Sequence, residues 1–211
     1  MLAQKHIASQ LLVFFMIGIK AASIKNNISD RKYLKMINRL KELPDKVKEV
    51  LSNVSEIEDI AKKIFKKDHC LFMSRGNNFP VALEGALKLK EISYIHAEGY
   101  PAAELKHGPI ALIDENMPVV VICTKSDEYD KILSNVMEIK ARKAIVIGIV
   151  DPKNFHMKKH FDYSIEVPNT SKDFSPIVNQ IPLQLIAYFC AILRGCDVDK
   201  PRNLAKSVTV E

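Results

Sequence analysis

Two stretches decide the fold of this chain: Val119-Val120-Val121-Ile122 and Ala144-Ile145-Val146-Ile147. Both are apolar at every position, as strands are in a parallel sheet that helices cover on both faces. Similar short runs, rich in β-branched residues, alternate with segments of helical pattern. The strands are expected at 70–74, 93–97, 118–123, 143–149 and 162–167, and the helices at 79–92, 127–141 and 175–194. The pattern predicts an α/β fold, with a doubly wound, parallel, five-stranded sheet flanked by helices.

A helical segment is expected before the sheet. Residues 1–66 have a helical pattern, with helices near 5–24, 31–41, 44–52 and 55–66. A length of 211 residues suits one main domain with appendages. We therefore divide the chain into a helical segment at 1–66, a main domain at 67–196 and a carboxyl-terminal tail at 197–211.

Composition narrows the classes of function. The net charge of +6 comes mainly from scattered lysines, without an arginine-rich block, so nucleic-acid binding is not expected. The charge serves solubility, or it attracts an anionic substrate such as a sugar phosphate. The four cysteines have no CxxC spacing, which favours a reducing, cytoplasmic setting. His69 beside Cys70 stands alone, and no histidine and cysteine cluster has metal-ligand spacing, so no metal is expected.

The amino terminus permits two interpretations. Lys5, the apolar run Leu11 to Ile19 and then Ala21-Ala22-Ser23 resemble the three parts of a signal peptide. The run is shorter than the roughly 20 apolar residues that span a bilayer. The same residues suit a buried helix, and no membrane association is expected.

Three charged residues share one stripe of the helix expected at 79–92. Glu84, Lys88 and Glu91 follow each other at i, i+4 and i+7. Such ladders usually face water and contribute little to stability. Alternatively, Lys88 holds Glu91 in place as a carboxylate base beside a sugar. Spacing does not separate the two interpretations.

Other candidate groups lie in loops and in the tail. The loop Ser74-Arg75-Gly76-Asn77-Asn78 follows a strand and opens a helix, so it is either an anion cradle or an ordinary turn. His107 precedes Gly108 and Pro109, which would end a helix and leave its imidazole at an exposed corner. The imidazole is then either an ordinary helix-end group or a proton-transfer group. Lys206 is either a residue of a loose tail or a lysine that forms a Schiff base, with Arg202 as electrostatic help or as an anchor for the tail.

Three separated motifs resemble the glucosamine-6-phosphate synthase family, also called glutamine:fructose-6-phosphate amidotransferase. They are Ala82 to Glu98 (ALEGALKLKEISYIHAE), Glu104 to Pro109 (ELKHGP) and Pro201 to Glu211 (PRNLAKSVTVE). The resemblance covers nearly all of 68–211 and extends more loosely back to Gln10. It implies the fold of the second sugar isomerase (SIS) domain, with residues 1–66 as the end of the first SIS domain and the helices between the two.

The resemblance also implies roles for single residues. Lys206 resembles the lysine that forms a Schiff base with fructose 6-phosphate, and Glu91 resembles the base that moves a proton between C1 and C2. His107 resembles the ring-opening histidine, which reaches the neighbouring subunit's site, so a homodimer is implied. The substrate-binding or supporting residues implied are Lys88, Glu84, Arg202 and Ala205, and no cofactor is implied.

The sequence also departs from the family pattern. Ala103 stands where the family has glycine, and Pro101 adds rigidity before His107. The family's glutaminase domain and the phosphate-binding loop of its first SIS domain have no counterpart here. A partner chain carrying both is the alternative to a homodimer.

Two functions therefore stay open. One is the isomerase part of an enzyme that makes glucosamine 6-phosphate from fructose 6-phosphate for UDP-N-acetylglucosamine synthesis. The other is a catalytically incomplete SIS fragment that only binds carbohydrate phosphate or dimerises, which predicts an exposed apolar face on residues 7–24. A transcription-regulating SIS protein ranks last, because residues 31–66 show no convincing helix-turn-helix.

Overall fold

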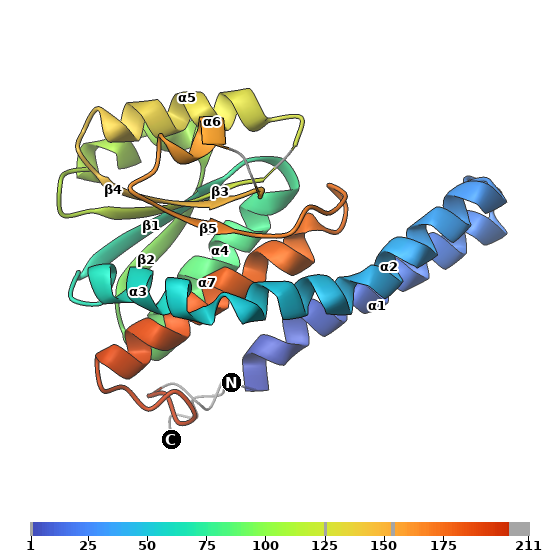
Figure 1. Ribbon diagram of the computed structural model, residues 1–211, viewed down its shortest axis with the longest axis horizontal. Coiled ribbons are helices and arrows are strands. Elements are labelled where there is room, and N and C mark those ends of the chain that lie inside the picture. Colours follow the sequence, from blue (N-terminus) through green and yellow to red (C-terminus); the bar gives the residue numbers. More distant parts are fainter. Residues whose placement is uncertain (1, 125, 153–154, 203–211) are drawn as a thin grey trace, which may run out of the picture.

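The computed structural model describes residues 2–124, 126–152 and 155–202 (Figure 1). Its centre is a sheet of five parallel strands in the order β2-β1-β3-β4-β5. The strands are β1 (His69–Ser74), β2 (His96–Pro101), β3 (Pro118–Cys123), β4 (Ile145–Val150) and β5 (Tyr163–Glu166). The order reverses between β1 and β3, as in other doubly wound sheets. The predicted fold class is confirmed.

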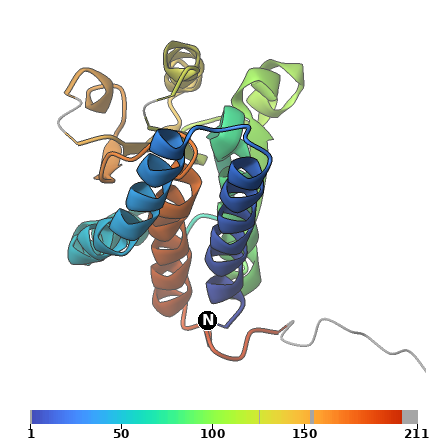
Figure 2. The same ribbon diagram turned by 90° about the vertical axis from the view of Figure 1, so that its right-hand side faces the viewer.

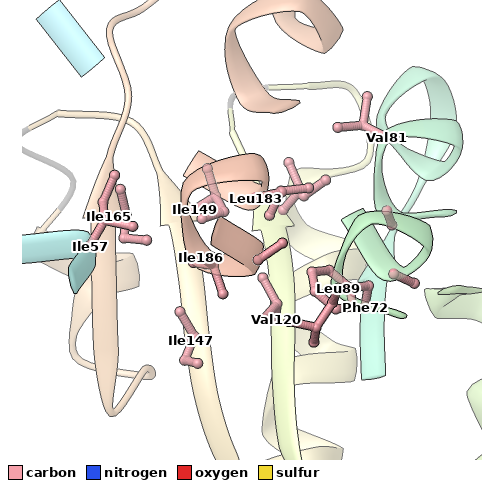
Figure 3. Packing of buried hydrophobic residues seen from close by; sticks show 14 of the residues in the cluster. Ile57, Phe72, Val81, Leu89, Val120, Ile147, Ile149, Ile165, Leu183 and Ile186 are labelled. Carbon is pink, nitrogen blue, oxygen red and sulfur yellow. The ribbon is translucent and has the colours of Figure 1, made fainter. Parts of the chain in front are cut away.

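One face of the sheet carries the larger helical layer. Its helices are α1 (Leu2–Ile24), α2 (Asp30–Ser52), α3 (Val54–Ile64), α4 (Phe79–Ser93) and α7 (Ser175–Leu193). Figure 3 shows Leu89 of α4 and Leu183 of α7 against Phe72 and Val120, which point to this face. A short 3-10 turn, η1 (Gly76–Asn78), leads into α4.

The opposite face carries smaller elements. They are the 3-10 helices η2 (Ala102–His107) and η3 (Pro109–Leu112), and the α-helices α5 (Tyr129–Lys140) and α6 (Phe155–Lys158). Leu105 of η2 and Val136 of α5 pack with Leu71 and Val121, which alternate along their strands with the residues of the first core. The two faces therefore have separate cores.

Two expected boundaries were wrong. The strand expected at 93–97 begins only at His96, because α4 continues to Ser93 and Tyr94 ends it in the left-handed conformation, with φ of 60°. The helices expected at 31–41 and 44–52 form one helix, α2, that runs through Pro44. Leu43 and Val50 are both buried, so packing on either side of the proline holds the helix together.

One interpretation expected a buried amino-terminal helix, but most of this helix is exposed. Figures 1 and 2 show α1 and α2 as an antiparallel hairpin whose turn extends beyond the sheet. Several of its large apolar side chains are exposed: Val13, Phe14, Met16 and Ile17. By length and composition, residues 7–24 and α7 could each cross a membrane, but α7 is largely a core helix. Only 6% of the stretch at 7–24 is buried, so most of its apolar surface is exposed.

Candidate functional site

Helix α4 is held unusually close to the sheet and to α7. A Cβ atom added at Gly85 would lie 2.8 Å from Cδ1 of Leu183 and 2.9 Å from Cδ1 of Phe72. Pro80 lies in the first turn of α4, where the missing N–H costs nothing. The helix is thus fixed in position, and with it the charged side chains on its flank.

These charged side chains form a buried cluster. The side chain of Lys88 is only 4% exposed, and those of Glu84 and Glu91 are also largely covered. The Lys88 Nζ atom lies 2.5 Å from Oε2 of Glu91 and 3.6 Å from Oε1 of Glu84. The interpretation of a ladder facing water was therefore wrong. A buried ammonium group needs such partners, because desolvation is otherwise costly.

The two carboxylates differ in their contacts. Glu91 accepts a short hydrogen bond from Lys88, which fixes the position of its carboxylate. Oε1 of Glu84 lies beyond hydrogen-bonding distance of Lys88 Nζ, although this oxygen is buried. Burial raises the pKa of Glu84, and the charge of Lys88 opposes that rise. The cluster thus holds one oriented carboxylate, Glu91, and a second, Glu84, whose pKa is raised above its ordinary value.

A cavity of about 480 Å³ lies beside Glu84, between α1, α4 and α7. Leu11 and Phe15 of α1 line one side of it, and Gln180 of α7 lines another. Its lining is mainly apolar with a few polar groups, a composition typical of small-molecule sites. α1 therefore contributes to a hollow that reaches the charged cluster.

His107 lies elsewhere in the molecule. It ends η2 at an exposed corner, where its Nδ1 atom is 2.6 Å from Oε2 of Glu104. The neighbouring Lys106 pairs with Glu138 of α5 at 2.9 Å, so η2 is held on the face of the sheet opposite α4. The exposed position was predicted, but the chain does not bring His107 to the Lys88 cluster.

The chain after α7 returns to the end of α4. The backbone N–H of Arg202 donates to the hydroxyl of Tyr94 at 3.0 Å, and its guanidinium lies 4.1 Å from the centre of the Tyr94 ring. Tyr94 directly follows α4 and is three residues beyond Glu91, so Arg202 is anchored at the end of the helix that carries that carboxylate. Lys206 and Ala205 lie outside the described residues.

Tyr94 was missed by sequence reasoning. The available signal was its place directly after α4, where a residue other than glycine in the left-handed conformation is uncommon. Such a residue costs free energy and persists only where its surroundings require it. Its contacts with Arg202 supply that requirement.

The loop at 74–78 behaves as a turn. Arg75 donates to Oδ1 of Asn135 at 3.0 Å and lies 3.9 Å from Glu128, while Lys172 pairs with Asp127 at 2.8 Å. These two cations line the small cavity of about 160 Å³ beside the loop, and both already face carboxylates. An anion in this cavity would have to displace the carboxylates from the two cations.

The sequence and fold also match known proteins. The profile of the SIS domain family matches residues 63–194, and the chain belongs to that family.

Within it, the chain is 50% identical over 207 residues to glutamine–fructose-6-phosphate aminotransferase [isomerizing] of Bacteroides thetaiotaomicron. It is 51% identical over 207 residues to the protein of that name from Chlorobaculum tepidum. Each match covers 98% of this chain and 34% of the relative, so the chain spans about a third of their length.

A solved structure gives the same result. The C-terminal domain of glucosamine-fructose-6-phosphate aminotransferase from Francisella tularensis superposes with a TM-score of 0.82 and 42% identity. The match covers 86% of this chain and 51% of that one. The sequence is thus similar to the carboxyl-terminal part of this aminotransferase, which confirms the resemblance noted from its motifs.

Proposed function

We propose that this chain is the isomerase part of an enzyme that makes glucosamine 6-phosphate from fructose 6-phosphate, for amino-sugar nucleotide synthesis. The observation that carries the proposal is the buried Lys88 held between Glu84 and Glu91 in a chain so similar to these aminotransferases. A charge ladder with only a structural role would gain little from burial. A proton shuttle needs a carboxylate in a fixed position, and burial supplies that.

The proposed chemistry divides between three groups. Lys206 adds to the C2 carbonyl of fructose 6-phosphate and forms a Schiff base with loss of water. After ammonia has replaced the lysine at C2, Glu91 removes a proton from C1 and returns it to C2, while the proton of the C1 hydroxyl passes to the C2 nitrogen. The product then has an amine at C2 and an aldehyde at C1. Lys88 keeps Glu91 oriented between these steps, and the contact of Arg202 with Tyr94 anchors the start of the tail at the end of α4.

The placement of His107 supports a second subunit in the proposed site. Ring opening of the sugar needs a proton-transfer group near the substrate, and His107 belongs to the opposite face of the sheet from Glu91. A second copy would supply its own His107 to the site of the first. We therefore propose a homodimer. We also propose the domain division 1–66, 67–196 and 197–211, and a cytoplasmic setting.

The exposed face of α1 supports a further partner. The relatives are about three times longer than this chain, and Val13, Phe14, Met16 and Ile17 are exposed. We propose that the parts of the enzyme that carry the glutaminase and the first SIS domain cover this face. They would also supply the ammonia and the grip on the substrate phosphate. The chain alone would then isomerise feebly, because positioning groups contribute orders of magnitude in rate.

The second candidate is a catalytically incomplete SIS module that binds carbohydrate phosphate or only dimerises. The same exposed face on residues 7–24 favours it, since that interpretation predicted the exposure.

Borohydride trapping separates the two candidates. The chain is incubated with fructose 6-phosphate and sodium borohydride, alone and mixed with the amino-terminal two thirds of a relative, and the modified lysine is located by peptide mass spectrometry. An adduct on Lys206 in the mixture, and none in Lys206→Arg, is expected. No adduct, either with the chain alone or in the mixture, would leave the incomplete module as the better account.

A further inference from the structure

Two histidines meet at the amino-terminal edge of the sheet, on the face opposite the Lys88 cluster. His69 begins β1 and His96 begins β2, and the parallel register places them side by side. Their side chains point to the face that carries η2 and α5, because His69 alternates with the buried Cys70 and Phe72 of the other face. Their Nδ1 atoms lie 3.2 Å apart.

This separation suits a shared metal ion. An ion about 2.0 to 2.1 Å from each of two nitrogens, with tetrahedral geometry, sets them roughly 3.3 Å apart. Without an ion, one Nδ1 must donate to the other, which requires a different tautomer on each ring. An ion binds both rings in a single tautomer, with Nδ1 as the ligand and the proton on Nε2.

A carboxylate stands behind one of the rings. Oε1 of Glu98 lies 3.6 Å from Nε2 of His96, and the other oxygen of Glu98 accepts a hydrogen bond of 2.6 Å from the hydroxyl of Tyr100. A carboxylate on this side favours the proton on Nε2 and frees Nδ1 as a ligand. Histidines that bind metals commonly donate a hydrogen bond from their second nitrogen. At 3.6 Å, Glu98 is an electrostatic partner of His96 rather than a hydrogen-bond acceptor.

The pair opens onto a cavity of about 520 Å³, which gives an ion and its water ligands an entry path. Asp68 and Asp114 line it together with Lys66 and Lys67, so the charges near the pair are mixed. Among the described residues, no group of three or more histidine, cysteine or acidic side chains is arranged for a metal. Water must therefore complete the coordination.

We propose that His69 and His96 bind a divalent transition-metal ion that favours imidazole, such as Zn²⁺, Cu²⁺ or Ni²⁺, with Glu98 as the orienting partner of His96. The site shares no side chain with the proposed isomerase chemistry, although it lies on the face of the sheet that carries η2. An ion there bridges β1 to the edge strand β2, so its binding also stabilises the fold.

Zinc titration calorimetry on the full chain tests the proposal. One Zn²⁺ ion per chain is expected, with affinity lowered about 10-fold or more in both His69→Gln and His96→Gln, and less in Glu98→Gln. The double variant His156→Gln/His160→Gln is the matched control, because its two rings also stand close together, with centres 5.8 Å apart. It should bind zinc as the wild type does.

A spectroscopic measurement counts the ligands. Electron paramagnetic resonance with one equivalent of Cu²⁺ should show two coupled imidazole nitrogens in the wild type, and one after either His69 or His96 is replaced. Thermal unfolding without metal confirms that each variant folds. Absence of zinc binding, zinc affinity unchanged in both single variants, or its loss in the control variant would overturn the proposal.

Discussion

Two charge ladders with similar spacing have very different surroundings. On α3, Lys62 lies 3.1 Å from Glu58 and 3.0 Å from Asp59, and its side chain is 47% exposed. On α4, Lys88 has carboxylates at i−4 and i+3, but only 4% of its side chain is exposed. The helical spacing of charges therefore does not reveal whether a ladder is a solvated surface or a buried site. The layer that covers it decides.

The largest expected effect comes from removing the buried cation. Lys88→Met leaves two carboxylates close together without their shared partner, which should cost about 3 to 5 kcal/mol of unfolding free energy. Lys62→Met on α3 is the matched control and should change stability little, because water solvates its partners. Urea denaturation of the three proteins measures the difference. Equal effects of the two substitutions would mean that the α4 ladder is not buried in solution.

A second substitution tests how closely α4 is packed. Gly85→Ala should lower the unfolding free energy by about 1 to 3 kcal/mol, because the new methyl group meets Leu183 and Phe72. Alanine is the better helix former, so a loosely held α4 would instead be stabilised by about 1 kcal/mol. Urea denaturation distinguishes the two signs.

The third prediction concerns pH. The pKa of Glu84 is raised above its ordinary 4.5, mainly by burial, so the folded chain keeps this proton longer than the unfolded chain. Its contribution to stability is therefore full below pH 4.5 and is lost as pH rises through the higher, folded pKa. Glu84→Gln should gain stability relative to the wild type from pH 4 to pH 7. A difference between the two proteins that is constant with pH would contradict the raised pKa.

The pH response of the α3 ladder should have another range. Hydrogen bonding to Asp59, and then to Glu58, raises the pKa of Lys62 above its ordinary 10.5. The resulting stabilisation is present below that pH and is lost as pH rises through the folded pKa. The pH dependence of the unfolding free energy of Lys62→Met should therefore differ from that of the wild type only in the alkaline range.

The smallest expected effect on stability is at the end of α4. Tyr94→Asn keeps a residue that tolerates the left-handed conformation but removes the ring beneath Arg202, at a cost of about 0.5 to 1 kcal/mol. Tyr94→Phe keeps the ring and loses only the hydroxyl. If Tyr94 positions the tail, borohydride trapping at Lys206 should slow in Tyr94→Asn and be largely retained in Tyr94→Phe. Unchanged trapping in Tyr94→Asn would remove that role.

Much of this architecture could be predicted from the sequence. The apolar runs around Val119 and Ile145 indicated a covered parallel sheet, because only buried strands lack a polar face. The family motifs also predicted the correct relatives, as the comparisons confirm.

What could not be predicted depends on distant packing. The burial of Lys88 requires α4 to lie against the rest of its layer, and the approach of His69 to His96 depends on strand register rather than spacing. The exposure of α1 depends on what covers it, which an apolar sequence does not state. The end of α4 shifted the second strand because Tyr94 adopts a conformation that sequence pattern does not predict.

The central claim is that Glu91, held by the buried Lys88, moves a proton between C1 and C2 of the sugar. Proton NMR of fructose 6-phosphate in D₂O tests it directly, with the chain supplemented by the amino-terminal two thirds of a relative. The account predicts that exchange of a C1 hydrogen for deuterium falls about 100-fold or more in Glu91→Gln, while Asp59→Asn on α3 exchanges like the wild type. Exchange in Glu91→Gln at the wild-type rate would contradict it.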